Sequence, residues 1–320
     1  MSMAHIAETS SKVAGYLIGY AKRMVPPSAV PAVTSAFDGM TNIGERASGM
    51  HDDLTPPLRV RLHIGPFLDP RLYRLTGERN VAAFKELAGL KREARFLDIG
   101  CGCGRVAVAL TKYLSSAAAY EGFDAAKKPV EWCQQQITPR FPNFRFRSTD
   151  TFSQRYNPTG GADASRLLFP YDDGSFDFAF AGSVYTHMLP EEAANYMSET
   201  ARVLKPGGIA FTTFCLFDEA TLPAVRAGLT TPNLVYQYGE FQVRTLDDPA
   251  HFIAQPEGYV RGLFSKNGLS IIEPIRRGTW AGITPESEKI ESYHLGGSPS
   301  HGSSQDAVIA SKGHSSLKLP

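Results

Sequence analysis

A buried strand that runs directly into a glycine-rich turn is the feature that most restricts how this chain of 320 residues folds. The stretch is RFLDIGCGCGR, in which apolar residues around Asp98 are followed by Gly100, Gly102 and Gly104. A strand that is apolar on both faces belongs in the centre of a parallel sheet. Glycine is favoured where the backbone takes φ > 0 or approaches a ligand closely. The stretch therefore predicts a central strand, a tight turn and a helix that begins behind the turn.

Short apolar runs alternate with helical patterns along the rest of the chain. Strands are expected at 95–100, 119–124, 144–148, 176–184, 208–217 and 306–311, and helices at 104–116, 128–137 and 190–204. This alternation predicts βαβ units, and hence an α/β fold with a doubly wound, mostly parallel sheet and helices on both faces. The strictly alternating run at 144–148 is typical of an edge strand.

The chain is predicted to have three parts. Residues 1–50 are expected to be a poorly ordered extension with one or two helical turns, because three prolines, the last of them Pro31, interrupt anything longer. Residues 51–93 are expected to form a helical cap, and residues 94–320 the main domain.

In two stretches of the main domain, predicted strands and helices do not alternate. Residues 218–256 are predicted to be an insertion that contains a hairpin turning at Gly239. Residues 279–305 are rich in Gly, Ser and His and are predicted to form a long loop.

Composition excludes several classes of protein. The formal net charge is +1, which speaks against nucleic acid as a partner. The four cysteines form no C-x-x-C pair, so neither a disulfide framework nor a metal site is expected. The apolar run at 13–21 is far short of the ~20 residues that cross a bilayer, so no transmembrane segment and a cytoplasmic location are expected.

The spacing of the glycines bears on the ligand. Dinucleotide-binding turns read G-x-G-x-x-G, whereas this turn reads G-x-G-x-G and Gly104 stands one residue too early. Asp98, two residues before the first glycine, disfavours a pyrophosphate and suits a ligand with a positive charge, such as an α-ammonium group. A turn that binds nothing is the structural alternative.

Two further acidic residues follow predicted strands. Asp124 ends the strand at 119–124, where a carboxylate can accept hydrogen bonds from both hydroxyls of a ribose. Asp150 lies just past the edge strand, where it can accept a hydrogen bond from an adenine amine or simply stabilise a loop.

Four motifs in this order resemble those of class I methyltransferases that use S-adenosylmethionine. They are FLDIGCGCGR, YEGFD, FPYDDGSFDFAFAGSVYTHM and ETARVLKPGG, within residues 60–216. The likeness is to bacterial enzymes that act on small molecules, since EWC, YNPTG, SVYTHM and QDAVIASK are also present. The resemblance implies a seven-stranded, Rossmann-like sheet whose last strand runs antiparallel.

The same resemblance implies a role for each candidate residue. It places Asp98 and the three glycines at the methionine part of the cofactor, Asp124 at the ribose and Asp150 beside the adenine. It places Ser183 at the methyl-donor pocket, and Tyr73 with Gly77 at the methionine end.

His187 is the candidate general base. It follows the fourth predicted strand, at the sheet edge where ligands bind in such folds, and an imidazole accepts a proton at neutral pH. A histidine that only packs under the following helix is the structural alternative.

The expected reaction is methyl transfer from S-adenosylmethionine to a small-molecule acceptor, namely a hydroxyl of a glycan, a glycolipid or a secondary metabolite. The insertion at 218–256 would lie on the substrate side. A nicotinamide-dependent oxidoreductase and a non-catalytic methyltransferase-like binding protein are the alternatives, and the oligomeric state is left open.

Overall fold

The computed structural model describes residues 30–47, 52–65, 69–281 and 305–313. They belong to two compact units, which join in the chain between Leu75 and Thr76. Residues 1–29 of the predicted extension and most of the predicted loop at 279–305 lie outside the described residues.

The first unit is helical over its described residues. It contains α2 (Val30–Ala47), α3 (Leu58–Arg61) and the start of α4 (Pro70–Ala88). Helix α2 has 18 residues, more than the one or two turns predicted for residues 1–50, because Pro31 lies in the first turn, where a proline is tolerated. The buried Arg61 donates to both carboxylate oxygens of Glu45, at 2.6 and 3.1 Å, and so joins α3 to α2.

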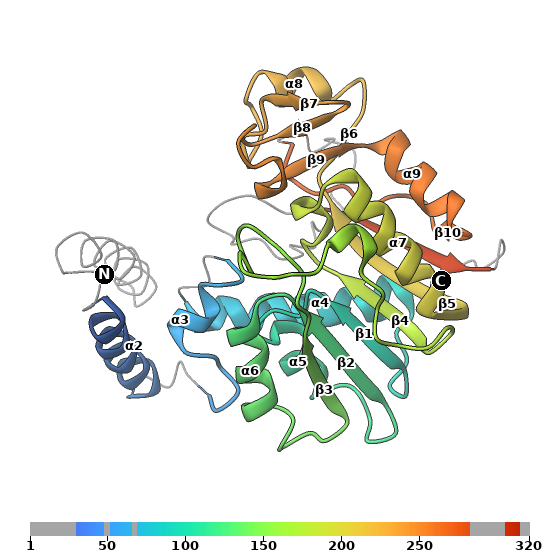
Figure 1. The fold of residues 1–320 in the computed structure, drawn as a ribbon. Helices are drawn as coiled ribbons and strands as arrows, with labels where there is room; N and C mark the ends of the chain where they lie inside the picture. The colour runs from blue at the N-terminus through green and yellow to red at the C-terminus, as the bar shows by residue number, and fades with distance from the viewer. Residues whose placement is uncertain (1–29, 48–51, 66–68, 282–304, 314–320) are drawn as a thin grey trace. The chain divides into compact units, whose positions relative to one another are not determined.

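The second unit is built on a seven-stranded sheet (Figure 1) in the order β10-β11-β5-β4-β1-β2-β3. The strands are β1 (Arg95–Ile99), β2 (Ala119–Asp124), β3 (Phe144–Ser148), β4 (Phe176–Ala181), β5 (Leu204–Phe214), β10 (Leu269–Ile271) and β11 (Asp306–Lys312). Neighbours pair in parallel, except that β11 is antiparallel to both β5 and β10. The predicted fold class is confirmed, including the antiparallel last strand and the edge position of β3.

Helices cover both faces of this sheet. They are α4, α5 (Arg105–Leu110), α6 (Lys127–Gln136), α7 (Pro190–Val203) and α9 (Glu257–Lys266), with single 3₁₀ turns at Ala164–Arg166, Tyr185–His187 and Pro249–His251. On one face, the Phe84 ring of α4 contacts four phenylalanine rings of β1, β4 and β5, with centroids 4.7–5.7 Å apart. On the other face, Leu97 and Ile99 of β1 share a buried core with α7 and α9.

A second, four-stranded sheet occupies most of the predicted insertion at 218–256 and lies beyond one end of the large sheet (Figure 1). Its order is β6-β9-β8-β7, with β6 (Leu216–Phe217), α8 (Leu222–Arg226), β7 (Tyr236–Tyr238), β8 (Phe241–Val243) and β9 (Ile253–Pro256). Strands β7 and β8 form the hairpin predicted at Gly239, whose φ is +59°.

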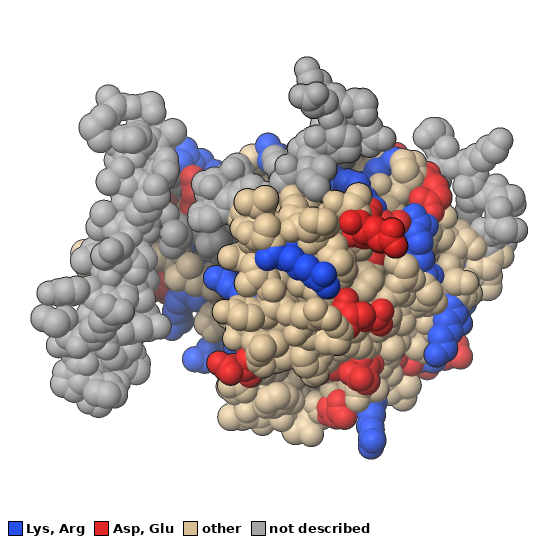
Figure 2. All heavy atoms as spheres, turned by 90° about the horizontal axis from the view of Figure 1, so that it is seen from above, with Lys and Arg blue, Asp and Glu red and all other residues tan. Residues whose placement is uncertain are grey.

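The surface carries charges of both signs. On the face shown in Figure 2, acidic and basic side chains are interspersed among uncharged ones. Within the described ranges, no helix is both long enough and apolar enough to cross a membrane.

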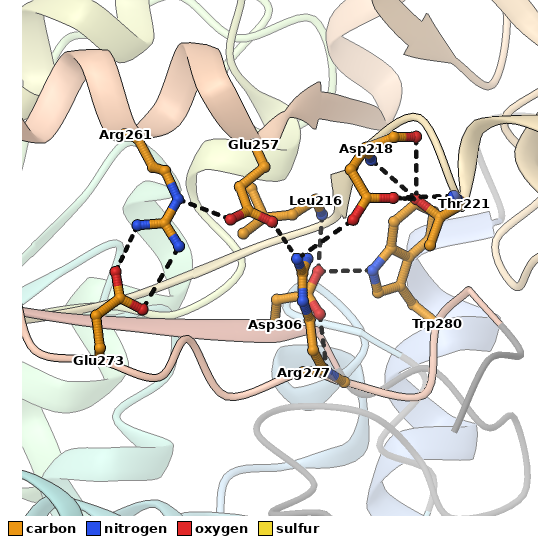
Figure 3. Close-up of polar contacts among 10 residues, drawn as sticks. Leu216, Asp218, Thr221, Glu257, Arg261, Glu273, Arg277, Trp280 and Asp306 are labelled. Carbon is orange, nitrogen blue, oxygen red and sulfur yellow. Dashed lines mark hydrogen bonds and ion pairs between the residues drawn. The ribbon is translucent and has the colours of Figure 1, made fainter. Parts of the chain in front are cut away.

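A buried aspartate at the start of β11 connects the large sheet to the insertion (Figure 3). The Asp306 carboxylate accepts hydrogen bonds from the Leu216 N–H, the Gly278 N–H and the Trp280 indole N–H, at 2.7–2.8 Å. Burial raises the pKa of Asp306 to about 6, although the three donors and the charge of Arg277 oppose the increase. Beside it, alternating acidic and basic side chains form a chain of ion pairs, made of Glu273, Arg261, Glu257, Arg277 and Asp218.

We expect Asp306→Ala to lower the free energy of unfolding by about 1–3 kcal/mol for each donor left buried without an acceptor. Urea denaturation measures this loss, and Asp306→Asn, which keeps one acceptor oxygen, should lose less. Because the folded pKa lies above the usual 3.8, the folded protein binds more protons than the unfolded chain between about pH 4 and 6. The stability of the wild type relative to Asp306→Asn should therefore fall as the pH rises through that window, and a constant difference would contradict the raised pKa.

Candidate active site

The predicted site residues that follow β1, β2, β3 and β4 come together at one edge of the large sheet. These strands are parallel, so their carboxyl ends lie side by side. The chain order reverses between β1 and β4, and open α/β sheets bind ligands at such a switch point.

The glycine turn takes the backbone conformation that its sequence predicts. Gly100, Gly102 and Gly104 have φ values of +74°, +52° and +75°. A Cβ atom on Gly100 would lie 2.5 Å from Cγ2 of Val184, and one on Gly104 would lie 2.8 Å from Cδ1 of Ile137. The turn is therefore held between α6 and the segment after β4, with no room for side chains at these two positions.

Asp124 is fixed by the backbone of the turn. Its Oδ2 atom accepts a hydrogen bond from the Gly102 N–H at 2.8 Å, and its Oδ1 atom accepts one from the Ala126 N–H at 2.7 Å. Burial raises the pKa of this carboxyl, and the backbone donors partly offset the effect. Each carboxylate oxygen can accept a further hydrogen bond, so the half-buried group remains suited to the predicted ribose contact.

Asp98 is buried, although the sequence predicts that its carboxylate meets a ligand's ammonium group. The residue is 2% exposed, and its carboxylate accepts a hydrogen bond from the Tyr120 hydroxyl at 2.6 Å. Burial raises the pKa of Asp98 to about 7, and the tyrosine hydrogen bond opposes this rise. Its role at the methionine part of a cofactor stays a prediction.

Asp150 is exposed and accepts a hydrogen bond from the Gly161 N–H at 3.1 Å. The Asp150 carbonyl also accepts from the Ala162 N–H, at 2.9 Å. These bonds match the loop-stabilising alternative, and an adenine contact stays a prediction.

Ser183 and His187 begin and end the turn that follows β4. Ser183 has φ +59° and is the non-glycine residue with a positive φ in the described part of the chain. The His187 imidazole lies 2.7 Å from the His251 carbonyl oxygen through Nδ1. A carbonyl oxygen only accepts hydrogen bonds, so Nδ1 carries the proton and Nε2 carries the lone pair.

The surroundings of His187 keep its ring neutral. Burial, followed by the charge of Arg155, lowers the pKa of His187 to about 4, although the backbone carbonyls at residues 250 and 251 oppose this. The rings of Phe252 and Tyr156 meet the imidazole nearly edge-on, with centroids 4.9 and 5.8 Å away. At neutral pH, His187 can therefore accept a proton at Nε2.

Tyr73 belongs to the first unit, and its predicted cofactor contact stays a prediction. Gly77 belongs to the second unit. A Cβ atom there would lie 2.4 Å from the Arg105 carbonyl oxygen, so this glycine allows α4 to pack on the start of α5.

Sequence reasoning gave no role to three further residues of the second unit. The Tyr156 ring lies against His187, and burial raises the pKa of its hydroxyl, with the charges of Arg155 and Asp124 acting in opposite directions. The Asn80 amide of α4 is buried, and neither of its polar atoms has a hydrogen-bond partner. Gln305, which immediately precedes β11, donates a hydrogen bond to Ser183. Tyr156 belongs to the motif YNPTG, which is the one sequence signal that could have pointed to it. No local sequence pattern sets Asn80 or Gln305 apart from other asparagines and glutamines.

The residues present fit an adenosyl cofactor. The turn has three glycines in the left-handed conformation, and Asp124 is oriented by two backbone donors. The unpartnered Asn80 amide lies one turn before Phe84, whose ring packs on Phe96, two residues before Asp98. All four cysteines are free and buried, and the described residues contain no group of three metal-ligating side chains.

The fold and this site define a Rossmann-like domain of the class I methyltransferase type. Residues 97–212 match the family model described as a methyltransferase domain. These residues are thus a class I S-adenosylmethionine-dependent methyltransferase domain, and the cofactor of this enzyme class is S-adenosylmethionine.

Similar proteins agree with this assignment. The chain is 28% identical to the O-methyltransferase cnsE of Penicillium expansum, over 52% of this chain and 55% of that protein. It therefore spans little more than half the length of that relative. It is 25% identical to the O-methyltransferase rstn1 of Aspergillus nomiae, over 73% of this chain and 91% of that protein.

Among solved structures, a SAM-dependent methyltransferase from Methanosarcina mazei aligns with a TM-score of 0.45 at 19% identity, over 70% of this chain and 94% of that one. The two relatives named above, cnsE and rstn1, are fungal, so the resemblance to bacterial enzymes in particular is not confirmed.

Proposed function

We propose that this chain transfers a methyl group from S-adenosylmethionine to the hydroxyl oxygen of a small-molecule acceptor. The observation that carries the proposal is a neutral histidine, with its lone pair on Nε2, on the turn that packs against the glycine loop. The names of the two fungal relatives, both O-methyltransferases, support oxygen as the acceptor atom.

In this proposal, the protein's own residues bind the cofactor, orient the acceptor and remove a proton from its hydroxyl. The glycine turn and Asp124 hold the cofactor, which supplies an activated methyl group on a sulfonium. The turn at 183–187 brings the acceptor hydroxyl in line, and positioning of this kind is worth up to about 7–11 kcal/mol in ideal cases. Nε2 of His187 accepts the proton that the hydroxyl loses as the new C–O bond forms.

The low pKa of His187 favours one of the three predicted acceptor classes. A ring whose pKa is about 4 takes a proton more readily from an acidic hydroxyl than from a sugar hydroxyl. We therefore propose a secondary metabolite with a phenolic or enolic hydroxyl, ahead of a glycan or a glycolipid.

Two measurements test the proposal. Calorimetric titration should show binding of S-adenosylhomocysteine and none of NAD or NADP; the reverse would identify a nicotinamide enzyme. Transfer of labelled methyl to matched phenol and alcohol acceptors should favour the phenol. Cofactor binding without transfer to any of a broad acceptor panel would indicate a non-catalytic binding protein.

We expect Asp124→Ala to weaken the binding of S-adenosylhomocysteine by roughly 1.5–3 kcal/mol, because hydrogen bonds to a charged acceptor are lost. Calorimetry measures the affinity, and thermal melting shows whether the turn still folds. Asp124→Asn is the matched control, since it keeps one oxygen for the Gly102 or Ala126 N–H. Unchanged affinity in a folded Asp124→Ala protein would exclude the ribose contact.

A further inference from the structure

Ser183 is held in a conformation that its own side chain disfavours. A left-handed backbone is uncommon for residues other than glycine, and it persists only where the surroundings enforce it. Ser183 lies two residues past β4, at the switch point of the sheet. Its neighbour Val184 is the residue that a side chain on Gly100 would strike.

A closed ring of hydrogen bonds enforces this conformation. The Ser183 N–H donates to Oγ1 of Thr213 at 2.7 Å, the Thr213 hydroxyl donates to Oε1 of Gln305 at 2.5 Å, and Nε2 of Gln305 donates to Oγ of Ser183 at 2.9 Å. Nε2 of Gln305 also lies 3.3 Å from the Thr186 hydroxyl. The Thr213 hydroxyl and the Gln305 amide each both donate and accept, an arrangement in which the bonds strengthen one another.

The ring connects three strands, and the side chains that reach Ser183 are buried. Thr213 and Thr186 are fully buried, and Gln305 is 8% exposed. Thr213 lies in β5, between β4 and β11, and Gln305 immediately precedes β11. The Gln305 side chain therefore reaches past β5 to a turn 122 positions away in sequence.

We infer that Gln305 is a positioning residue for methyl transfer: by closing this ring it holds Ser183 left-handed and keeps the 183–187 turn, with His187, against the glycine loop. The inference rests on the proposed function, because it assigns that turn to the cofactor and the acceptor.

A rescue experiment separates positioning from simple stability. Gln305→Leu removes the donor and the acceptor, so Ser183 should leave φ +59°. The affinity for S-adenosylhomocysteine and the single-turnover rate should each fall on the order of tenfold. Adding Ser183→Gly should restore most of both, because glycine adopts positive φ without strain. If Gln305 only anchors β11, the melting temperature falls and Ser183→Gly restores neither affinity nor rate, which would overturn the inference.

Gln255 provides the matched control. It is also a buried glutamine, and its Nε2 donates to the Tyr185 carbonyl in the same turn at 2.9 Å, but it does not touch the ring. Any loss caused by Gln255→Leu should therefore not be rescued by Ser183→Gly. Equal rescue of both variants would contradict a specific role of Gln305.

Hydrogen exchange in the cofactor-free protein tests the inference independently of the proposed function. Peptides that cover residues 183–188 should exchange faster in Gln305→Leu than in the wild type, whether or not an adenosyl ligand binds. Unchanged exchange there would overturn the positioning role. Absence of S-adenosylhomocysteine binding in the wild type would instead reject the proposed function.

Discussion

Gly102→Val is expected to weaken the binding of S-adenosylhomocysteine by about 10²–10⁴-fold while the sheet still folds. A β-branched residue is strained at the φ of +52° that Gly102 adopts. We expect the turn to relieve this strain by rotating the 102 N–H away from Asp124, so that the carboxylate proposed to bind the ribose loses one of its two backbone donors. Calorimetry measures the affinity, and far-UV circular dichroism confirms the fold.

Gly104→Val is the informative comparison. A Cβ atom at Gly104 would lie 2.8 Å from Ile137 and 3.0 Å from Cys133, so its side chain collides with α6. The main effect of Gly104→Val should therefore be a loss of stability, whereas the main effect of Gly102→Val should be a loss of affinity for S-adenosylhomocysteine. A Gly102→Val protein that melts and binds like the wild type would show that the turn has no part in cofactor binding.

His187→Ala is expected to lower the single-turnover rate by about 10²–10⁴-fold, the usual effect of removing a positioned general base, with little change in cofactor affinity. His187→Asn separates the two roles of the ring. An asparagine amide can still donate to the His251 carbonyl but cannot accept the acceptor's proton. If the asparagine variant is as slow as the alanine variant, the base is His187; recovery of the rate would show that the residue only holds the turn.

The pH dependence follows from the same environment. A free imidazole would lose activity below about pH 6.5. Because the pKa of His187 is lowered to about 4, its lone pair stays available well below neutral pH. The rate should therefore remain level from pH 7 to about pH 5 and fall only near pH 4. A fall centred near pH 6.5 would place the base elsewhere.

The type of several secondary-structure elements could be predicted because it depends on residues that are adjacent in sequence. The run from Arg95 to Ile99 is apolar on both faces, so it had to lie inside a parallel sheet, and it does. Gly239 between two β-rich runs predicted a hairpin, which the structure contains. The prediction for residues 1–50 underestimated α2, because Pro31 limits a helix only when it lies beyond the first turn.

The burial and electrostatic surroundings of the candidate site residues, by contrast, could not be predicted from their neighbours in sequence. Asp98 and His187 have unusual pKa values because of burial and of charges distant in sequence, Asp124 for Asp98 and Arg155 for His187. Asp150 and Asp124 both lie at or just past the end of a predicted strand. In the structure, Asp150 is exposed, whereas Asp124 is fixed by hydrogen bonding to the glycine turn.

By itself, the sequence determined the α/β class, the glycine turn with its left-handed residues, and the acidic residues that end consecutive strands, since periodicity and glycine content act over a few residues. Only the tertiary structure decided the raised pKa of Asp98, the tautomer of His187 and the ring that joins Ser183, Thr213 and Gln305. These properties depend on burial and on hydrogen bonds between residues as much as 122 positions apart, which the folded sheet alone brings within 3 Å.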